Sequence, residues 1–174
     1  MQIKYSNIGA TEPILASDVK AWLKVDFNDE DALINSLITQ VREIAEEASG
    51  LALIDKTIEY FEDDADILSD WIKLPYPQHN AITEVKVNGE VTTSYAKTGL
   101  TQFLIGVDNF ASTTSSDNGI YVKYTTLANC PEGVKLAMLE AIAENYEKRG
   151  NTFEGGLVKM TDNFYNHLQK FKVY

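Results

Sequence analysis

NDEDALINSLITQVREIAEEASG, residues 28–50, is the stretch that decides the fold. Asn28 is an expected N-cap, the acids that follow it favour a helix N-terminus, and Gly50 is a common residue just past a helix end. Between them, apolar residues recur every three or four positions and so line one side of a helix: Ile34, Leu37, Ile38, Val41, Ile44, Ala45 and Ala48. The stretch predicts a long amphipathic helix over residues 29–49.

A shorter helix is predicted just before this one, and a second long helix well after it. Ser17 is the expected N-cap of a helix over residues 18–24, whose inner side carries Val19, Trp22 and Leu23. Pro131 suits the first position of a helix over residues 132–148. That helix is apolar on two sides, which is typical of a helix packed on both, within a domain or between subunits. One side carries Val134, Met138, Ala141, Ile142 and Asn145, and the other Leu136, Leu139, Ala143 and Tyr146.

The segment between these helices, about residues 54–125, reads as an antiparallel β section. Asn88-Gly89 stands between two β-rich runs, 82–87 and 90–92, and suits a tight hairpin turn because both residues tolerate positive φ. Further strands are predicted over residues 57–61, 71–74, 103–105 and 119–124. The acidic run 62–66 and the Ser/Thr-rich run 112–118 are expected to be loops.

The order of these elements predicts an α+β fold. A mainly helical domain is expected over residues 1–150, containing the N-terminal helix pair, the inserted β section and the helix 132–148. Residues 151–174 are predicted to form a C-terminal arm with a short helix. Gly155-Gly156 would provide its flexible joint, and Phe164, Leu168 and Phe171 mark the helix.

Net charge is −11 and is unevenly distributed along the chain. Residues 148–174 carry five basic and two acidic side chains, a net of +3, which leaves −14 on residues 1–147. An acidic body argues against a dedicated DNA-binding protein, because contacts from Lys and Arg to phosphate supply most of that affinity. The basic tail is expected either to dock on an acidic partner or to fold back onto its own body.

Residues that commonly serve catalysis or metal binding are scarce. His79 and His167 are the only histidines and Cys130 is the only cysteine, so no zinc-binding spacing exists. The acids between Asp26 and Glu30 lack the glycine and the twelfth-position acid of a calcium loop. Cys130 is better explained as a residue near a helix start than as a nucleophile. We expect no enzymatic activity, no cofactor and no metal.

The chain is expected to stay in the cytoplasm and to have no membrane partner. No apolar run approaches the ~18 residues needed to cross a bilayer, and the N-terminus lacks the pattern of a secretory signal. A single cysteine gives no reason to expect an oxidising compartment.

Several motifs follow one another in a characteristic order. EPILASDVKAWLKVD, residues 12–26, leads into the acidic start of the first long helix. The later motifs are Leu74-Pro75-Tyr76-Pro77, Val85-Lys86-Val87, Val122-Lys123-Tyr124, and a helix that opens Pro131-x-x-Val134-Lys135 and closes Tyr146-Glu147-Lys148-Arg149. Together, over about residues 12–149, they resemble the head–tail connector (adaptor) family of tailed phages. The β section between residues 88 and 120 is longer than the family pattern, and residues 150–174 match no motif of it.

The resemblance implies a structural protein of the virion neck, made in the cytoplasm of an infected or lysogenic bacterial host. It implies a closed ring of about twelve copies, with the portal protein on one face and a head-completion or tail protein on the other. Packaged DNA would pass through the lumen without tight binding, past an acidic wall. The candidate subunit interface is Leu136, Leu139, Ala143 and Tyr146, and the candidate portal-docking arm carries Lys159, Phe164, Leu168, Lys170, Phe171 and Lys172.

Two alternatives stay open. A head-completion stopper or tail-terminator subunit is also a ring protein, but those lean more on β structure and are not expected to begin with two capped helices. A small accessory enzyme, using Cys130 or the acidic clusters, is the other alternative.

Overall fold

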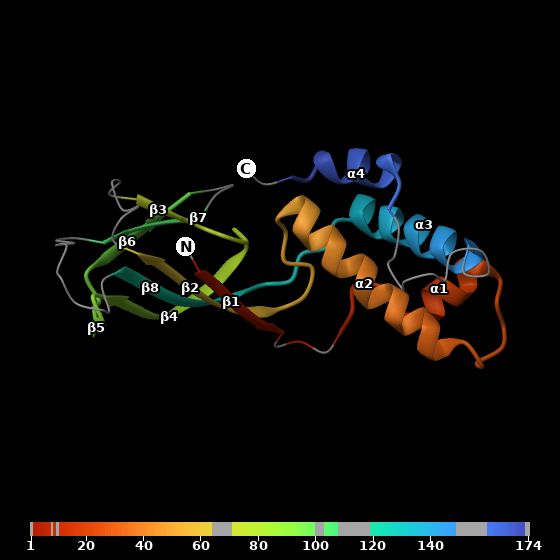
Figure 1. Cartoon of the computed structure of the whole chain (residues 1–174), viewed down its shortest axis with the longest axis horizontal. Helices are drawn as coiled ribbons and strands as arrows, with labels where there is room; N and C mark the ends of the chain where they lie inside the picture. The colour runs from red at the N-terminus through yellow and green to blue at the C-terminus, as the bar shows by residue number, and fades with distance from the viewer. Residues whose placement is uncertain are drawn as a thin grey trace. The chain divides into compact units, whose positions relative to one another are not determined.

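The chain forms two compact units, each built from separate stretches of sequence. The structure is a computed structural model that describes residues 2–7, 9, 11–63, 71–99, 103–107, 119–148 and 160–172 (Figure 1). One unit, the β unit, comprises Met1–Ala10, Ile54–Ala128 and Val173–Tyr174. The other, the helical unit, comprises Thr11–Leu53 and Asn129–Lys172. The predicted α+β class is confirmed, although this division differs from the predicted boundary at residue 150.

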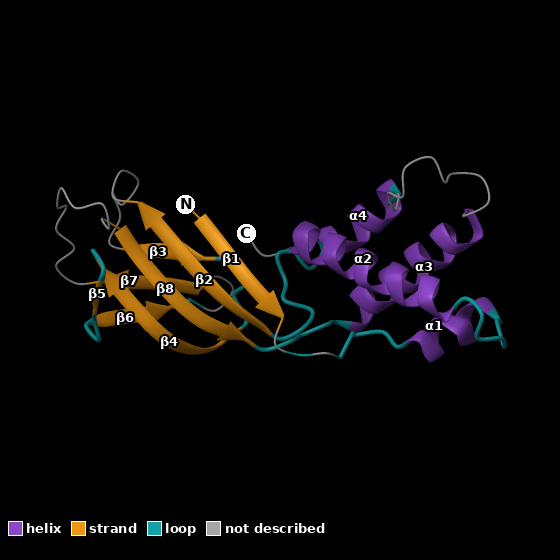
Figure 2. Ribbon diagram, turned by 60° about the horizontal axis from the view of Figure 1, so that its bottom comes forward, coloured by secondary structure: helices purple, strands orange, loops and turns teal. Residues whose placement is uncertain are grey.

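The helical unit contains four helices. They are α1 (Ala16–Leu23), α2 (Asp31–Ser49), α3 (Glu132–Lys148) and α4 (Asp162–Gln169). α2 and α3 run antiparallel, because hydrogen bonds join them at both ends: the Tyr146 hydroxyl donates to Glu30, and the Asn129 amide donates to the Ala52 carbonyl at 3.0 Å. α4 packs against both α2 and α3. Figure 2 shows these helices in purple.

The helix starts differ slightly from the predicted ones. α1 begins at Ala16 with Leu15 as its N-cap, so Ser17 lies in the first turn, where the Asp18 carboxylate accepts the Leu15 amide at 3.1 Å. α2 has Glu30 as its N-cap in place of Asn28, whose carbonyl instead accepts the Asp31 amide at 3.1 Å in a preceding turn. Helix starts of this kind are decided by local backbone hydrogen bonds that sequence preference alone does not rank.

Gly50 is confirmed as the cap of its helix, whereas Pro131 precedes its helix and does not occupy the first helical position. Gly50 caps the C-terminus of α2 with φ of 74°, in the left-handed region that glycine adopts without strain. Pro131 stands one residue before α3, and its carbonyl accepts the amides of Val134 and Lys135 at 2.9 and 3.1 Å.

The core of the helical unit follows the predicted stripe of α2. Most of its members are buried, while Ile44 and Ala48 at one margin are half-buried. Trp22 is an exception to the prediction for α1, since 49% of it is exposed. Val19 alone is buried on that short helix, because eight residues provide only two turns to face the core. The buried set of the stripe is Ile34, Leu37, Ile38, Val41 and Ala45.

The β unit consists of two antiparallel sheets. The larger has the order β1-β2-β8-β4-β5 and the smaller the order β3-β7-β6. The strands of the larger are β1 (Gln2–Asn7), β2 (Lys56–Asp63), β8 (Gly119–Thr126), β4 (His79–Val87) and β5 (Glu90–Val91); those of the smaller are β3 (Trp71–Leu74), β7 (Phe103–Val107) and β6 (Tyr95–Thr98). The predicted hairpin is confirmed, with positive φ at both Asn88 (51°) and Gly89 (84°).

The two sheets enclose a second apolar core. Along β8, buried and half-buried residues alternate, as expected when one face of a strand is covered. Gly119 at its start has φ of 146°, and a Cβ there would collide with the Glu62 carbonyl oxygen. The core cluster is Ile58, Tyr60, Ile72, Leu74, Val85, Ile120, Val122 and Tyr124.

Two strands and part of a predicted loop differ from the sequence prediction. β1 and β6 were not predicted. Glu62 and Asp63, placed in an acidic loop by the prediction, belong to β2 because they pair with Ile120 and Gly119. The rest of that run, residues 64–66, and the predicted loop 112–118 lie outside the described residues.

Candidate interaction surfaces

The second apolar side of α3 divides into exposed and buried parts. Leu136 is 39% exposed, and Leu139 and Ala143 are half-buried. Tyr146, the fourth residue of the predicted interface, is only 8% exposed and donates its hydroxyl hydrogen bond to Glu30. It follows Ile142 by four positions and therefore lies on the same side of α3 as the buried Met138 and Ile142. Within the single chain Tyr146 is therefore part of the packing of the helical unit, and the subunit interface stays a prediction, with Leu136, Leu139 and Ala143 as its more exposed members.

The predicted arm is represented by α4 and the residues after it. Thr161 is the N-cap, and its hydroxyl accepts the Phe164 amide at 3.4 Å. Phe164 and Leu168 are buried within the helical unit. The Phe171 ring is half-buried and lies so close to Gly133 of α3 that a Cβ there would meet it. Of the basic side chains, Lys170 and Lys172 are exposed, whereas Lys159 lies outside the described residues. The apolar part of the predicted arm thus packs on its own body.

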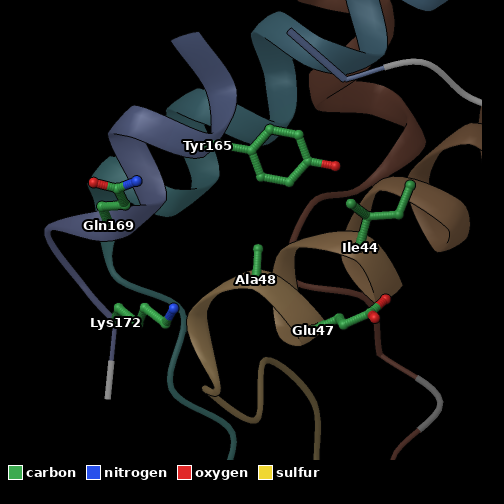
Figure 3. Close-up of a pocket in the computed structure, with 6 residues that line it drawn as sticks. All are labelled: Ile44, Glu47, Ala48, Tyr165, Gln169 and Lys172. Atoms are coloured by element: carbon green, nitrogen blue, oxygen red, sulfur yellow. The ribbon is translucent and has the colours of Figure 1, made fainter. Parts of the chain in front are cut away.

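A groove of about 390 Å³ runs between α2 and α4. Figure 3 shows Tyr165 of α4 across from Ile44 and Ala48 of α2. Its other lining residues are polar or charged: Glu47, Gln169 and Lys172. The lining residues named here include no histidine, cysteine or serine.

A buried ion-pair network fixes the chain on either side of α2. Arg42 and Glu46 are each 2% exposed, and the Arg42 Nη1 lies 2.7 Å from a Glu46 carboxylate oxygen. The Arg42 Nε donates to Glu12 at 2.7 Å, and Glu12 also accepts the Thr39 hydroxyl at 3.1 Å. The other oxygen of Glu46 accepts the Leu53 amide at 2.9 Å. Burial opposes the charge on Arg42, yet the two carboxylates outweigh it and raise the Arg42 pKa.

The outer face of the larger sheet carries a row of alternating charges. The register places Lys4 of β1 beside Glu59 of β2, Glu59 beside Lys123 of β8, and Lys123 beside Glu84 of β4. We call these four residues the charge row. Lys123 donates to Glu59 at 3.2 Å, and this hydrogen bond lowers the Glu59 pKa and raises the Lys123 pKa.

The inner side of β1 is only partly covered. Ile3 is 40% exposed and Tyr5 57% exposed, although both point to the face that the smaller sheet covers elsewhere. The buried Lys56 side chain fixes this strand, because its ammonium lies 4.7 Å from the Tyr5 ring centre and 5.4 Å from that of Tyr76.

The structure describes the side chains of two of the residues considered for catalysis, Cys130 and His167. The Cys130 thiol is half-buried, and burial raises its pKa to about 11, which leaves little nucleophilic thiolate at neutral pH. His167 lies half-buried on α4, and the side chain of His79 lies outside the described residues. Among the side chains that the structure describes, no group of three His, Cys, Asp or Glu is placed to hold a metal. In the same part of the chain, no helix combines the length and the apolar character needed to span a bilayer.

Comparison with known proteins gives one family match and several similar structures. Residues 15–102 match a family model described as phage gp6-like head-tail connector protein. No curated protein matches the sequence. A solved chain from the virion of a native gene transfer agent (GTA) particle has a TM-score of 0.71 at 13% identity, covering 98% of this chain and 95% of that one. Chains from two GTA necks, an empty particle computed with C6 symmetry and a native one computed with C12 symmetry, have TM-scores of 0.71 and 0.66. Their identities are 13% and 12%, with coverage of 98% of this chain and 96% of each of theirs.

Proposed function

The chain belongs to the phage gp6-like head-tail connector protein family, and from that membership we propose that it is a non-enzymatic subunit of a ring in the neck of a phage or phage-like particle. The family match carries the proposal. The similar chains support it, since they come from GTA particles and two of them from necks computed with sixfold and twelvefold symmetry. The ring would join the portal protein to a head-completion or tail protein, after assembly in the bacterial cytoplasm.

Ring closure requires a head-to-tail interface, in which two different surfaces of one subunit meet those of its neighbours. We place one of these surfaces on the outer side of α3, at Leu136, Leu139 and Ala143. Leu136 is among the large apolar residues that the helical unit leaves exposed. The other sides of α3 pack against α1, α2 and α4. Burial of its exposed apolar side chain against another subunit would remove that surface from water and so favour association.

Leu136→Glu is expected to weaken ring formation by at least about tenfold, because a carboxylate buried without a partner costs more than ~1.4 kcal/mol. Its effect on folding should stay within about 0.5 kcal/mol, since the site is exposed in the single chain. Sedimentation and negative-stain images would report the ring, and thermal unfolding the monomer. Val91→Glu is the matched control, because Val91 is also exposed but lies on β5 of the β unit, away from α3. A variant that unfolds, or that forms rings as the wild type does, would contradict this placement.

DNA is proposed to pass through the ring without being held. The −14 charge of residues 1–147 supports this, because a negative wall gains no counterion release from contact with phosphates.

We therefore expect the intact protein to bind a labelled DNA duplex more weakly than ~10⁻⁴ M at physiological salt. Fluorescence anisotropy would measure this, with a basic non-specific DNA-binding protein as the positive control. Micromolar binding at that salt concentration would contradict the passage of DNA along an acidic wall.

The portal is proposed to contact the C-terminal segment. Because Phe164 and Leu168 are buried in the helical unit, the residues left for this contact are the exposed Lys170 and Lys172, with Lys159 beyond the described part. Their charge suits an acidic partner surface and predicts attachment that weakens as salt is raised.

A further inference from the structure

The two opposite edges of the larger sheet, formed by β1 and β4, are complementary to one another. At one side lies β1, whose outer edge pairs with no strand in the described residues. At the other lies β4, where β5 pairs only with Lys86 and Val87, and the Thr92 amide reaches the Val85 carbonyl at 2.9 Å. Within the part of the chain that the structure describes, no strand pairs with the remaining outer edge of β4, residues 79–84.

The charge row ends in a cation at the β1 side and in an anion at the β4 side, where Glu84 also lies 3.1 Å from the Lys86 ammonium of the same strand. Its four members alternate from Lys4 at the β1 side to Glu84 at the β4 side. Each of the strands β1, β2, β8 and β4 contributes one charge, and an alternating row of four charges that begins with a cation ends with an anion. A second copy placed beside the first would bring its Lys4 next to Glu84 and continue the alternation, an arrangement that stabilises cross-strand neighbours.

The neighbouring row, on the inner face, is apolar at both of its ends. It runs Tyr5, Ile58, Tyr124, Ile82 through the same four strands. Ile58 and Tyr124 are buried, whereas Tyr5 is largely exposed and Ile82 is half-buried. A second copy that placed its Tyr5 against Ile82 would cover both ends of this row at once and remove their apolar surface from water.

Strand direction permits the same arrangement. β1, β2, β8 and β4 alternate in direction, so β4 runs opposite to β1 (Figure 2). In a ring, a neighbouring copy is related by a small rotation and keeps nearly the same orientation. Its β1 would therefore meet β4 antiparallel, which continues the hydrogen-bonding pattern of the sheet.

We propose that β1 of one copy pairs with the free edge of β4 in the next copy, with Lys4 opposite Glu84 and, across the register shift that β4 shows between Ile82 and Glu84, Tyr5 opposite Ile82. This second subunit contact rests on the proposed ring and is distinct from the contact placed on α3. It gives the exposed edge strand β1 a partner that is always present in the assembly, which prevents pairing with unrelated chains.

A cysteine pair tests the contact directly. In a Cys130→Ser background, Lys4→Cys together with Glu84→Cys should give a ladder of disulfide-linked multimers under mild oxidation. Directly opposed cross-strand residues have Cβ atoms about 4.5–5.5 Å apart, close enough to bridge with a small adjustment. The two cysteines cannot bridge within one chain, because three strand spacings separate them by about 14 Å. A mixture of the two single variants should stop at the covalent dimer.

The control pair is Lys97→Cys with Glu84→Cys, since Lys97 is exposed on β6 of the other sheet. Cross-linking should fall at least about tenfold for this pair relative to the test pair. Rings seen in negative-stain images of the test pair without any cross-link would overturn the edge contact and leave the proposed ring intact. A protein that gave neither rings nor cross-links would overturn both.

Discussion

Arg42→Met is expected to destabilise the protein by about 3–5 kcal/mol, the usual cost of removing one partner from a buried ion pair. Methionine keeps an unbranched apolar stem but carries no charge, so the variant leaves the buried Glu46 carboxyl without its cation. Glu12, which also loses its hydrogen bond from Arg42, holds the segment before α1 against α2. The loss should therefore loosen the start of the helical unit as well as the interior of α2.

Chemical denaturation with helix content as the signal would measure this loss. Arg42→Met with Glu46→Gln is the informative second variant, because glutamine keeps an acceptor for the Leu53 amide and removes the charge. It should recover at least half of the lost stability. Lys135→Met is a matched control, since Lys135 makes an ion pair with Glu132 at the surface of α3, where such pairs contribute about 0–1 kcal/mol. An Arg42→Met protein of wild-type stability would show that the network carries no net free energy.

Phe164→Ala is expected to cost about 3–5 kcal/mol and Leu168→Ala about 2–5 kcal/mol, because each removes a side chain buried between helices and leaves a cavity. The predicted mobile arm would show no such effect, since an arm contributes to docking and not to folding. The two variants therefore decide whether the C-terminal segment is packed in solution as it is in the structure.

Thermal unfolding of the purified protein measures both variants. The control is Lys170→Glu with Lys172→Glu, which reverses two exposed charges and should change stability by less than about 0.5 kcal/mol per site. The same charge reversal should weaken attachment to the portal at low salt, and the difference should fade as salt is raised. Wild-type stability in Phe164→Ala and Leu168→Ala would favour the free arm.

Elements with strong local signals were predicted well. The stripe of α2 and its glycine cap fix that helix without help from the rest of the chain, and Gly50 has the expected φ. Asn88-Gly89 likewise fixes a turn from two residues alone. The family resemblance, drawn from the order of several motifs, was also confirmed.

Elements that depend on distant partners were missed. β1 has the mixed sequence QIKYSN, and its pairing with residues 56–61 is set by a strand some fifty positions away. Trp22 has helical spacing from Val19, yet it stays exposed because α1 is short. A single sequence reveals periodicity along an element but not which side of it another element will cover.

The residues of the candidate surfaces likewise divide into those with a local signal in the sequence and those whose position depends on distant partners. Tyr146 is buried and donates to Glu30, a residue 116 positions away, so its place on the inner side of α3 has no local signal. The ion pair of Arg42 and Glu46 did have a local signal in the sequence, which was overlooked. The two opposite charges stand four residues apart, and each is adjacent to a member of the predicted apolar stripe. The charge row depends on strand register and became visible only in the structure.

The interleaving of the two units has a consequence for synthesis. The chain leaves the β unit after residue 10, returns to it at residue 54 and leaves it again after residue 128. β1 is made before its partner β2, and β2 is made before its second partner β8. Likewise, α2 is made before α3 and α4, the later helices that pack against it. On the ribosome, therefore, neither unit reaches its native contacts until most of the chain has been translated. A prematurely terminated product therefore presents unpaired strands and an α2 without its later packing partners, the exposed surface that makes incomplete chains prone to aggregation.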